Sequence, residues 1–359
     1  MYQIVVIDAM KSNKSLLGQR YDYPEFSQSA RLHSSKEGAR NEILKLLEQC
    51  EPESIACLCG EHQEKHIEVL ATIDRWGLPV RTGLCKSCGL VRIEPRHNSS
   101  IYESIYKNIY WELSHGAKDL TEKRFLLSVK RAKPFADHLI NNYKFAGKKL
   151  LEIGASYGAG LYRLKDEDCK KLVGYDYDKE FLKKGREYTG LDLRYGGVDE
   201  ALIDKDKYDL VILRHVFEHF LKPSRELSSL SELLEEDGML FIEVPGVFTV
   251  SFWYDDLLEY FDFFHPYSYT LSTLKNEMSK SGYVLHKADE HIYSFWHYKG
   301  NSLEIDPAIN EASRVKNHLQ HIERKRARRE SFYSALPVKV ILKFAYFGRT
   351  FQNWLFKKN

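Results

Sequence analysis

Histidine and glutamate side chains that can move protons are grouped at two places in the chain. Residues 208–220 read YDLVILRHVFEHF, in which an apolar stretch is followed by His215, Glu218 and His219. His265 stands in a second segment that reads YFDFFHPYSYTL. A histidine titrates near neutral pH and is therefore suited to accept a proton from a reacting group. These four residues are the predicted catalytic candidates.

Four cysteines form two pairs, and each pair is followed by a glycine. Residues 57–60 read CLCG and residues 85–89 read CKSCG. Two thiolate pairs in tight turns are the parts of a zinc site, and four protein ligands leave no open position for catalysis. The pattern predicts structural zinc, with an unmetallated ribbon or redox chemistry as the alternatives. The predicted ligands are Cys57, Cys59, Cys85 and Cys88.

The first cysteine pair departs from the usual C-x-x-C spacing. Ala56 stands where the first cysteine of that motif is expected. Cys50, His62 and His66 are nearby, and we regard them as weaker substitute ligands.

A glycine-rich turn and a following acid predict a nucleoside-containing cofactor. Residues 150–161 read LLEIGASYGAGL, and residues 172–178 read LVGYDYD, which places an acid about 20 residues beyond the glycines. Glycines let the backbone approach a ligand closely, and the acid can hold a ribose diol. The alternative is an ordinary turn of an unrelated α/β enzyme. The residues concerned are Glu152, Gly154, Ala155, Ser156, Gly158, Gly160 and Asp176.

Alternating strands and helices over residues 147–298 must position these groups. Such alternation predicts a mostly parallel sheet, closed by strands at 283–287 and 292–297. Ligands of open α/β sheets bind beyond the carboxyl ends of the strands, where the candidate residues are expected. We divide the chain into an N-terminal segment (1–50), a zinc ribbon (51–98), a helical lid (99–145), a cofactor-binding domain (146–300) and a basic helical tail (301–359).

The turn, the acid and two later strands together resemble the class I S-adenosylmethionine (SAM)-dependent methyltransferases. Their first motif is E/D-x-G-x-G-x-G, and Ser156 replaces the middle glycine here. The segments 208–220 and 233–246 resemble the fourth and fifth strands of the same family in order and spacing. The resemblance implies a Rossmann-like sheet with an antiparallel last strand, and SAM as the cofactor.

The resemblance also implies roles for the candidate residues. Glu152 and the 154–160 turn would face the methionine part of SAM, and Asp176 would bind the ribose hydroxyls. Asp199 is the adenine-side candidate, although a surface acid is an equal alternative. Arg214 and His215 would lie close to the methionine part and the reacting methyl group.

The order of a zinc ribbon followed by this domain resembles that of a bacterial group of sugar methyltransferases. The group includes enzymes of nucleotide sugars and polysaccharide gene clusters, and its Tyr-rich lid is matched by IYESIYKNIYWELSHG. The segment with His265 resembles its substrate loop, in which a histidine acts as base. The C-methylating branch usually carries H-x-H, whereas this chain has Phe263-Phe264-His265, which favours O-methylation.

A divalent metal is a further alternative at the same strand end. Small-RNA and ubiquinone-pathway O-methyltransferases carry E-x-x-E-H there, and this motif can bind a metal. In this chain His215 stands for the first Glu, with Glu218, His219 and His265 as companions. The simpler interpretation, which we favour, is that Glu218 and His219 cap and orient the helix beneath the site.

The end of the chain is strongly basic. From residue 314 onward there are 12 Lys or Arg and 2 Asp or Glu. A helix over residues 338–357 would carry one apolar stripe, which suits peripheral contact with an anionic membrane, packing on protein or, less well, nucleic-acid binding. No run of 18 apolar residues and no signal peptide is found, so we expect a cytoplasmic protein, with the inner membrane face as an option.

These observations predict a SAM-dependent enzyme that O-methylates a sugar of a surface polysaccharide or its nucleotide precursor. The acceptor would be a small molecule or a lipid-linked sugar. The alternatives are an RNA methyltransferase, C-methylation of a nucleotide sugar, and a non-catalytic SAM-binding scaffold.

Overall fold

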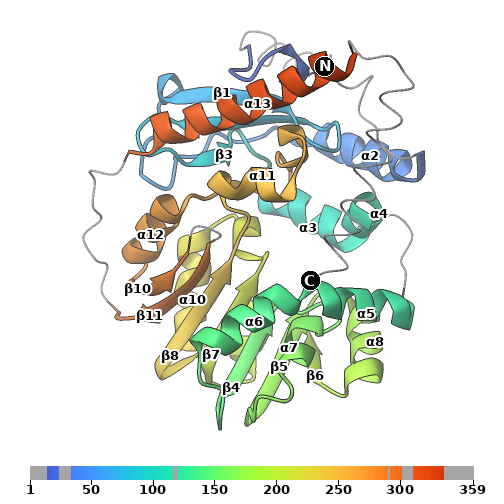
Figure 1. The fold of residues 1–359 in the computed structure, drawn as a ribbon, viewed down its shortest axis with the longest axis vertical. Coiled ribbons are helices and arrows are strands. Elements are labelled where there is room, and N and C mark those ends of the chain that lie inside the picture. Colours follow the sequence, from blue (N-terminus) through green and yellow to red (C-terminus); the bar gives the residue numbers. More distant parts are fainter. Residues whose placement is uncertain (1–13, 24–33, 116–119, 290–291, 301–309, 335–359) are drawn as a thin grey trace.

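The larger part of the fold is a seven-stranded sheet. The computed structural model describes residues 14–23, 34–115, 120–289, 292–300 and 310–334 (Figure 1). The strand order is β10-β11-β8-β7-β4-β5-β6. The strands are β4 (Lys149–Ile153), β5 (Lys171–Asp176), β6 (Asp192–Tyr195), β7 (Tyr208–Arg214), β8 (Leu234–Glu243), β10 (Tyr283–Ala288) and β11 (Tyr293–Tyr298).

Parallel pairing runs from β8 through β7, β4 and β5 to β6. β11 is antiparallel to β8, and β10 is antiparallel to β11. The predicted mostly parallel sheet with an antiparallel last strand is therefore confirmed. Residues 210–213 of β7 are fully buried, because a parallel sheet of this kind is covered on both faces.

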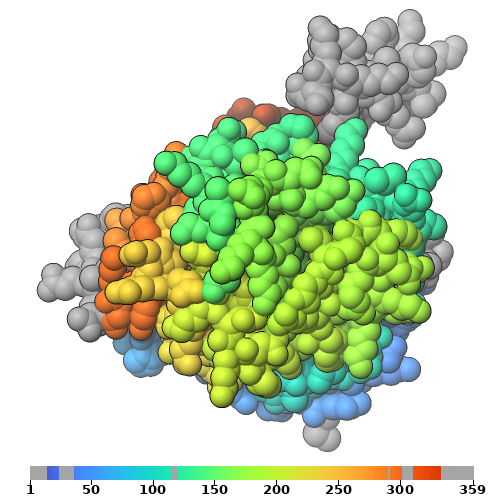
Figure 2. Space-filling model, turned by 90° about the horizontal axis from the view of Figure 1, so that it is seen from below, coloured from blue at the N-terminus to red at the C-terminus, as the bar shows by residue number. Residues whose placement is uncertain are grey.

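Helices cover both faces of this sheet. On one face Phe135 and Leu139 of α6 (Lys133–Asn142) pack against Leu150 of β4. On the other face α10 (Pro223–Glu232) and α12 (Leu271–Lys280) pack through Leu227 and Leu274. The remaining helices of the domain are α5 (Glu122–Arg131), α7 (Ala159–Arg163), α8 (Lys179–Thr189) and α9 (Val198–Ile203). Figure 2 shows the side of the molecule on which this domain, from green to yellow, forms most of the surface.

A second, antiparallel sheet lies across the top of the view in Figure 1, in the order β1-β2-β3-β9. Its strands are β1 (Ile67–Ile73), β2 (Pro79–Cys85), β3 (Val91–Ile93) and β9 (Tyr267–Ser268). β9 comes from the segment between β8 and β10, so the chain returns from the large sheet to complete the small one. The sequence did not predict this strand, because two residues carry no readable alternation.

Helices and short turns fill the space around the small sheet. α13 (Ala312–Ser334) lies over it and buries Val315 and Leu319 in the same cluster as Ile73 and Leu84. The other elements are η1 (Gln19–Tyr21), α2 (Ser34–Leu47), η3 (Glu64–His66), α3 (Ser99–Asn108), α4 (Tyr110–His115), η4 (Phe217–His219), η5 (Val247–Thr249), α11 (Val250–Trp253) and η6 (Leu257–Glu259).

Gly185 of α8 permits close packing of this helix on the turn after β4. A Cβ atom at Gly185 would lie 2.5 Å from the carbonyl oxygen of Tyr157 and 2.6 Å from Cδ1 of Leu193. Because a backbone oxygen cannot turn aside, Gly185→Ala should lower the free energy of unfolding by about 1–3 kcal/mol. Urea unfolding followed by circular dichroism measures the change.

Gly38 of α2 provides the matched control, since nothing lies within 4 Å of the Cβ atom that it lacks. Gly38→Ala should raise the free energy of unfolding by about 0.4–1 kcal/mol, because alanine restricts the unfolded chain. Equal effects of the two substitutions would contradict the packing argument.

Candidate functional site

The turn after β4 adopts a backbone shape that favours glycine. Gly154 and Gly158 have φ values of 75° and 74°, and Ser156 has a φ of 50°. A Cβ atom at Gly154 would lie 2.4 Å from Cγ2 of Val216, the residue next to His215. The glycine therefore allows the turn to touch the segment that carries the predicted catalytic residues.

Asp176 lies at the carboxyl end of β5 and faces this turn. One carboxylate oxygen accepts the N–H of Ser156 at 2.8 Å, and the other accepts the N–H of Asp178 at 2.8 Å. Burial raises the pKa of Asp176, while these two amides act against the increase. Each oxygen has a second lone pair, so the carboxylate can also accept hydrogen bonds from a diol.

Two exposed aromatic rings stand beside Asp176 and were not predicted. The rings of Tyr177 and Tyr195 have centroids 5.7 Å apart in an edge-to-face arrangement. They are 59% and 46% exposed, an unusual exposure for two large rings at a strand end. In the sequence only their positions could have indicated these two tyrosines. Tyr177 directly follows Asp176, and Tyr195 ends the neighbouring strand β6.

Glu152 is fully buried behind helix α7. A Cβ atom at Gly160 would lie 2.9 Å from both carboxylate oxygens of Glu152. Burial raises the pKa of Glu152, and the nearby Arg214 opposes the increase. The Arg214 Nε atom lies 3.3 Å from Glu152 Oε1, and its guanidinium stands 4.8 Å from the ring centre of Phe135. This ion pair therefore joins the ends of β4 and β7 beneath the turn.

Asp199 lies on α9 and points to the surface. Its carboxylate is 65% exposed and stands 3.6 Å from the equally exposed Arg225. This placement fits the surface alternative for Asp199 better than a contact with adenine.

His215 sits between two buried carboxylates at the end of β7. Its Nε2 atom lies 3.3 Å from Glu243, and its Nδ1 atom lies 3.5 Å from Glu218. Partial loss of solvation lowers the pKa of His215, whose side chain is 53% exposed, but the two carboxylates outweigh this effect and raise the pKa to about 10. At neutral pH the side chain is therefore an imidazolium, which is a poor base. Glu243 was not predicted, because it ends a different strand, β8.

Glu218, His219 and His265 meet next to this pair. Each offers a potential ligand atom, and these atoms lie within 4.8 Å of one another. The ring centroids of His219 and His265 are 4.9 Å apart. Burial lowers the pKa of His265 to about 4, so its imidazole is neutral at pH 7 and can accept a proton. Both oxygens of Glu218 lack a hydrogen-bond donor among the described residues.

His219 is oriented by two neighbours. Its Nδ1 atom lies 2.7 Å from the carbonyl oxygen of Phe264 and 2.8 Å from the hydroxyl of Tyr106. A carbonyl oxygen can only accept a hydrogen bond, so the Nδ1 atom of His219 carries a proton. Tyr106 belongs to α3, which places the predicted Tyr-rich lid against the site.

The four predicted zinc ligands come together beside the small sheet β1-β2-β3-β9, which we call the N-terminal sheet. Their sulfur atoms lie within 4.8 Å of one another, with 3.7 Å between Cys57 and Cys88 and 3.8 Å between Cys59 and Cys85. Thiolates at these distances repel one another unless a cation lies between them. The N–H of Leu90 donates to the Cys88 sulfur at 3.4 Å, as expected of a knuckle turn.

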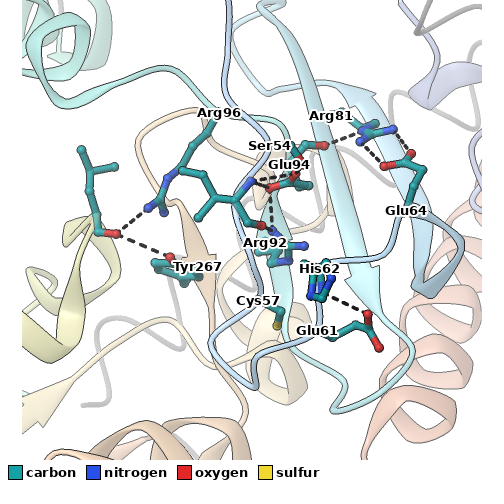
Figure 3. Close-up of polar contacts among 12 residues, drawn as sticks. Ser54, Cys57, Glu61, His62, Glu64, Arg81, Arg92, Glu94, Arg96 and Tyr267 are labelled. Atoms are coloured by element: carbon teal, nitrogen blue, oxygen red, sulfur yellow. Dashed lines mark hydrogen bonds and ion pairs between the residues drawn. The ribbon is translucent and has the colours of Figure 1, made fainter.

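The weaker substitute ligands are engaged elsewhere. The Nδ1 atom of His62 lies 3.5 Å from the carbonyl oxygen of Gly60, and the His66 ring lies 3.4 Å from Glu61. Glu61 also accepts the backbone N–H of His62 at 3.0 Å (Figure 3). The Cys50 sulfur accepts a hydrogen bond from Asn98 at 3.2 Å. Neither histidine nor Cys50 joins the four-sulfur group.

Comparisons with known proteins agree on the larger domain. Residues 128–288 match a family model described as a methyltransferase domain. The "Probable S-adenosylmethionine-dependent methyltransferase" of Mycolicibacterium smegmatis is 27% identical over 110 residues, which are 30% of this chain and 42% of that protein. A tRNA U34 carboxymethyltransferase of Campylobacter hominis is 30% identical over 121 residues, which are 31% of this chain and 38% of that protein.

Solved structures that resemble this chain include a methyltransferase in complex with the Trm112 methyltransferase activator of Haloferax volcanii. It is 18% identical, covers 47% of this chain and 76% of its own, and has a TM-score of 0.41. The chain spans less than half the length of each curated relative that it matches. Residues 128–288 of this chain form a class I S-adenosylmethionine-dependent methyltransferase domain.

Proposed function

We propose that this chain methylates an oxygen of a sugar, either in a surface polysaccharide or in its nucleotide precursor, with His265 as the base. The observation that carries the proposal is the neutral, half-buried His265 beside His219 and Glu218. This group adjoins the 154–158 turn through Val216. A base and a cofactor turn at one edge of the sheet are what methyl transfer to a hydroxyl requires.

The residues of the chain divide the work as follows. Asp176 accepts hydrogen bonds from the ribose, and the turn approaches the cofactor closely. S-adenosylmethionine supplies an activated methyl group, so the protein has to align the acceptor and remove one proton. His265 takes that proton. His215 is held as an imidazolium by Glu243 and Glu218, and it keeps the Glu218 carboxylate in place.

Aromatic side chains around the base support a sugar acceptor. Tyr106 lies 4.9 Å from Tyr110 and 5.4 Å from Phe264, measured between ring centroids. Tyr106 and Tyr110 each offer an apolar body with a polar tip, which suits the mixed surface of a sugar, whereas Phe264 is buried and only supports Tyr106. The acceptor would be a small molecule or a lipid-linked sugar.

Methylation of RNA is the second candidate function. One curated relative is a tRNA U34 carboxymethyltransferase, and the exposed face of α13 is basic. The exposed cations of α13 include Arg324, Lys325, Arg328 and Arg329. Nucleic acid that copurifies with the protein and is released by salt would favour this alternative over a sugar acceptor. C-methylation and a non-catalytic scaffold remain weaker alternatives.

A divalent metal at Glu218, His219 and His265 is an alternative mechanism at the same site. The three ligand atoms are close enough to hold an ion. The imidazolium of His215 lies 3.5 Å from Glu218 and would repel a second cation at this carboxylate, so we retain the proton-transfer mechanism. Calorimetry with Mn²⁺ on zinc-loaded protein distinguishes the metal mechanism from the proton-transfer mechanism, because only the first requires Mn²⁺ to bind.

The membrane contact of the C-terminal tail stays a prediction. Residues 335–359, which include the apolar stripe, lie outside the described residues. The earlier part of the tail forms α13 and packs on the N-terminal sheet through Val315 and Leu319. No helix among the described residues combines the length and the apolarity that a bilayer crossing needs.

Asp176 tests the cofactor site. Asp176→Ala removes the two amide contacts and the acceptor for the ribose, so affinity for S-adenosylhomocysteine should fall by about 1–3 kcal/mol. Isothermal titration calorimetry measures the change. Asp206→Ala, which removes surface ion pairs with Lys171 and Arg194, is the control and should leave affinity unaltered. Equal affinity of the Asp176 variant and the wild type would exclude Asp176 as the ribose ligand.

The cysteine group is tested by metal analysis. We expect one zinc ion per chain held by the four thiolates, and loss of that zinc in the double variant Cys85→Ser, Cys88→Ser. Cys169→Ser, which changes a cysteine outside the group, should keep its zinc. A folded, active wild-type protein that contains no zinc would refute the assignment.

His265 tests the mechanism. His265→Ala should lower the turnover number at least ~100-fold, the usual loss when a general base is removed. Affinity for S-adenosylhomocysteine should stay the same, because His265 belongs to the acceptor side. Activity assays on sugar acceptors together with calorimetry provide both numbers. Turnover that survives His265→Ala but not His215→Ala would reverse the two roles.

A further inference from the structure

The segment that carries His265 is held by the N-terminal sheet. Residues 261–266 form no helix or strand of their own. The following residues form β9, in which Tyr267 pairs with Arg92 of β3. The N–H of Ile93 also donates to the carbonyl oxygen of Pro266 at 3.0 Å. His265 therefore depends on contacts with a part of the chain that lies outside the methyltransferase domain.

Asp74 makes a further, fully buried contact with the His265 segment. It lies in the turn between β1 and β2 and has no exposed surface. One carboxylate oxygen accepts the N–H groups of Trp76 at 2.9 Å and Leu78 at 2.8 Å, which closes the turn. The other oxygen accepts the N–H of Phe263 at 3.0 Å, across 189 residues of sequence.

Asp262 makes the reciprocal contact from the His265 segment. One of its oxygens accepts the indole N–H of Trp76 at 3.2 Å and the N–H of Phe264 at 3.0 Å. Its other oxygen lies 3.7 Å from the Arg75 guanidinium. The N–H of Arg75 donates to the carbonyl oxygen of Phe261 at 2.8 Å. Two turns distant in sequence thus hold each other through buried acids.

These bonds reach His265 and His219 by short steps. The N–H of His265 donates to the carbonyl oxygen of Asp262 at 3.0 Å. The carbonyl oxygen of Phe264 fixes the ring of His219 at 2.7 Å. Phe263 is further held by stacking on Tyr102, with ring centroids 4.8 Å apart and planes 15° apart. A shift of the 262–264 backbone would therefore move both imidazoles.

We propose that Asp74 is a positioning residue, which holds the 262–264 backbone so that His265 and the carbonyl oxygen of Phe264 keep their places beside His219. The N-terminal sheet then supports the active site by holding the 262–264 backbone in position. The catalytic meaning of this role rests on the proposed function, whereas the hydrogen-bonded arrangement does not.

The test compares Asp74→Asn with Glu94→Gln in the full-length, zinc-loaded chain. Glu94 is equally buried, and its carboxylate accepts hydrogen bonds from Ser54, Ile55 and Arg92 (Figure 3). Within the described part of the chain this carboxylate makes no bond to residues 261–266, and it is connected to them through the pairing of Arg92 with Tyr267. Both variants replace a buried carboxyl by an amide of nearly the same shape. The readouts are hydrogen exchange of the 261–266 amides and the NMR resonance of the His265 ring at pH 8, where its imidazole is neutral.

In Asp74→Asn we expect the 261–266 amides to exchange about five- to tenfold faster, the change that follows loss of one buried hydrogen bond. The His265 ring resonance should move toward the position of an unfolded histidine. In Glu94→Gln both should match the wild type. Zinc content and affinity for S-adenosylhomocysteine should be equal in all three proteins.

Unchanged exchange and an unchanged His265 resonance in Asp74→Asn would overturn the proposal, and so would equal changes in both variants. Should Asp74→Asn fail to fold, Trp76→Phe removes the indole N–H donated to Asp262, together with part of the buried ring. A smaller shift of the His265 resonance in the same direction supports the proposal, and none overturns it. Failure of the wild type to bind S-adenosylhomocysteine would refute the proposed function and leave this test unaffected.

Discussion

The close contact between Gly154 and Val216 is the constraint on which the candidate site depends. A side chain at position 154 would overlap Val216, so only glycine allows the two strand ends to meet this closely. The contact brings the turn after β4 against the residue that follows His215. Cofactor turn and proton-transfer group are thereby placed at one edge of the sheet, at the carboxyl ends of β4 and β7.

Acids and cations alternate along this edge, with two cations for three carboxylates. Glu152 pairs with Arg214, and His215 lies between Glu218 and Glu243. Each acid is buried, so each would be costly without its cationic neighbour. One oxygen of Glu152 and both oxygens of Glu218 still lack hydrogen-bond donors among the described residues. A bound ligand that donates hydrogen bonds would remove this cost, which is a physical reason to expect polar ligands here.

The two sheets are interlocked, and the C-terminal helix adds to this arrangement. β9 joins the small sheet, and the Asp74 and Asp262 turns hold each other. Helix α13 begins against the second cysteine knuckle, where the N–H of Glu311 donates to the carbonyl oxygen of Cys88 at 3.3 Å. A Cβ atom at Gly89 would lie 2.7 Å from the backbone of Ala312, so the knuckle glycine also permits this docking.

The sequence by itself determined the parallel sheet and the position of Asp176 one strand after the glycine turn. These features follow from local patterns, because strand periodicity, glycine turns and cysteine spacing are written in neighbouring residues. Only the tertiary structure decided that Glu243 holds His215 as an imidazolium, that Asp199 points to solvent, and that Asp74 holds the His265 segment. Such contacts join residues far apart in the chain, and no local pattern carries information about which distant backbone group a buried carboxylate will meet.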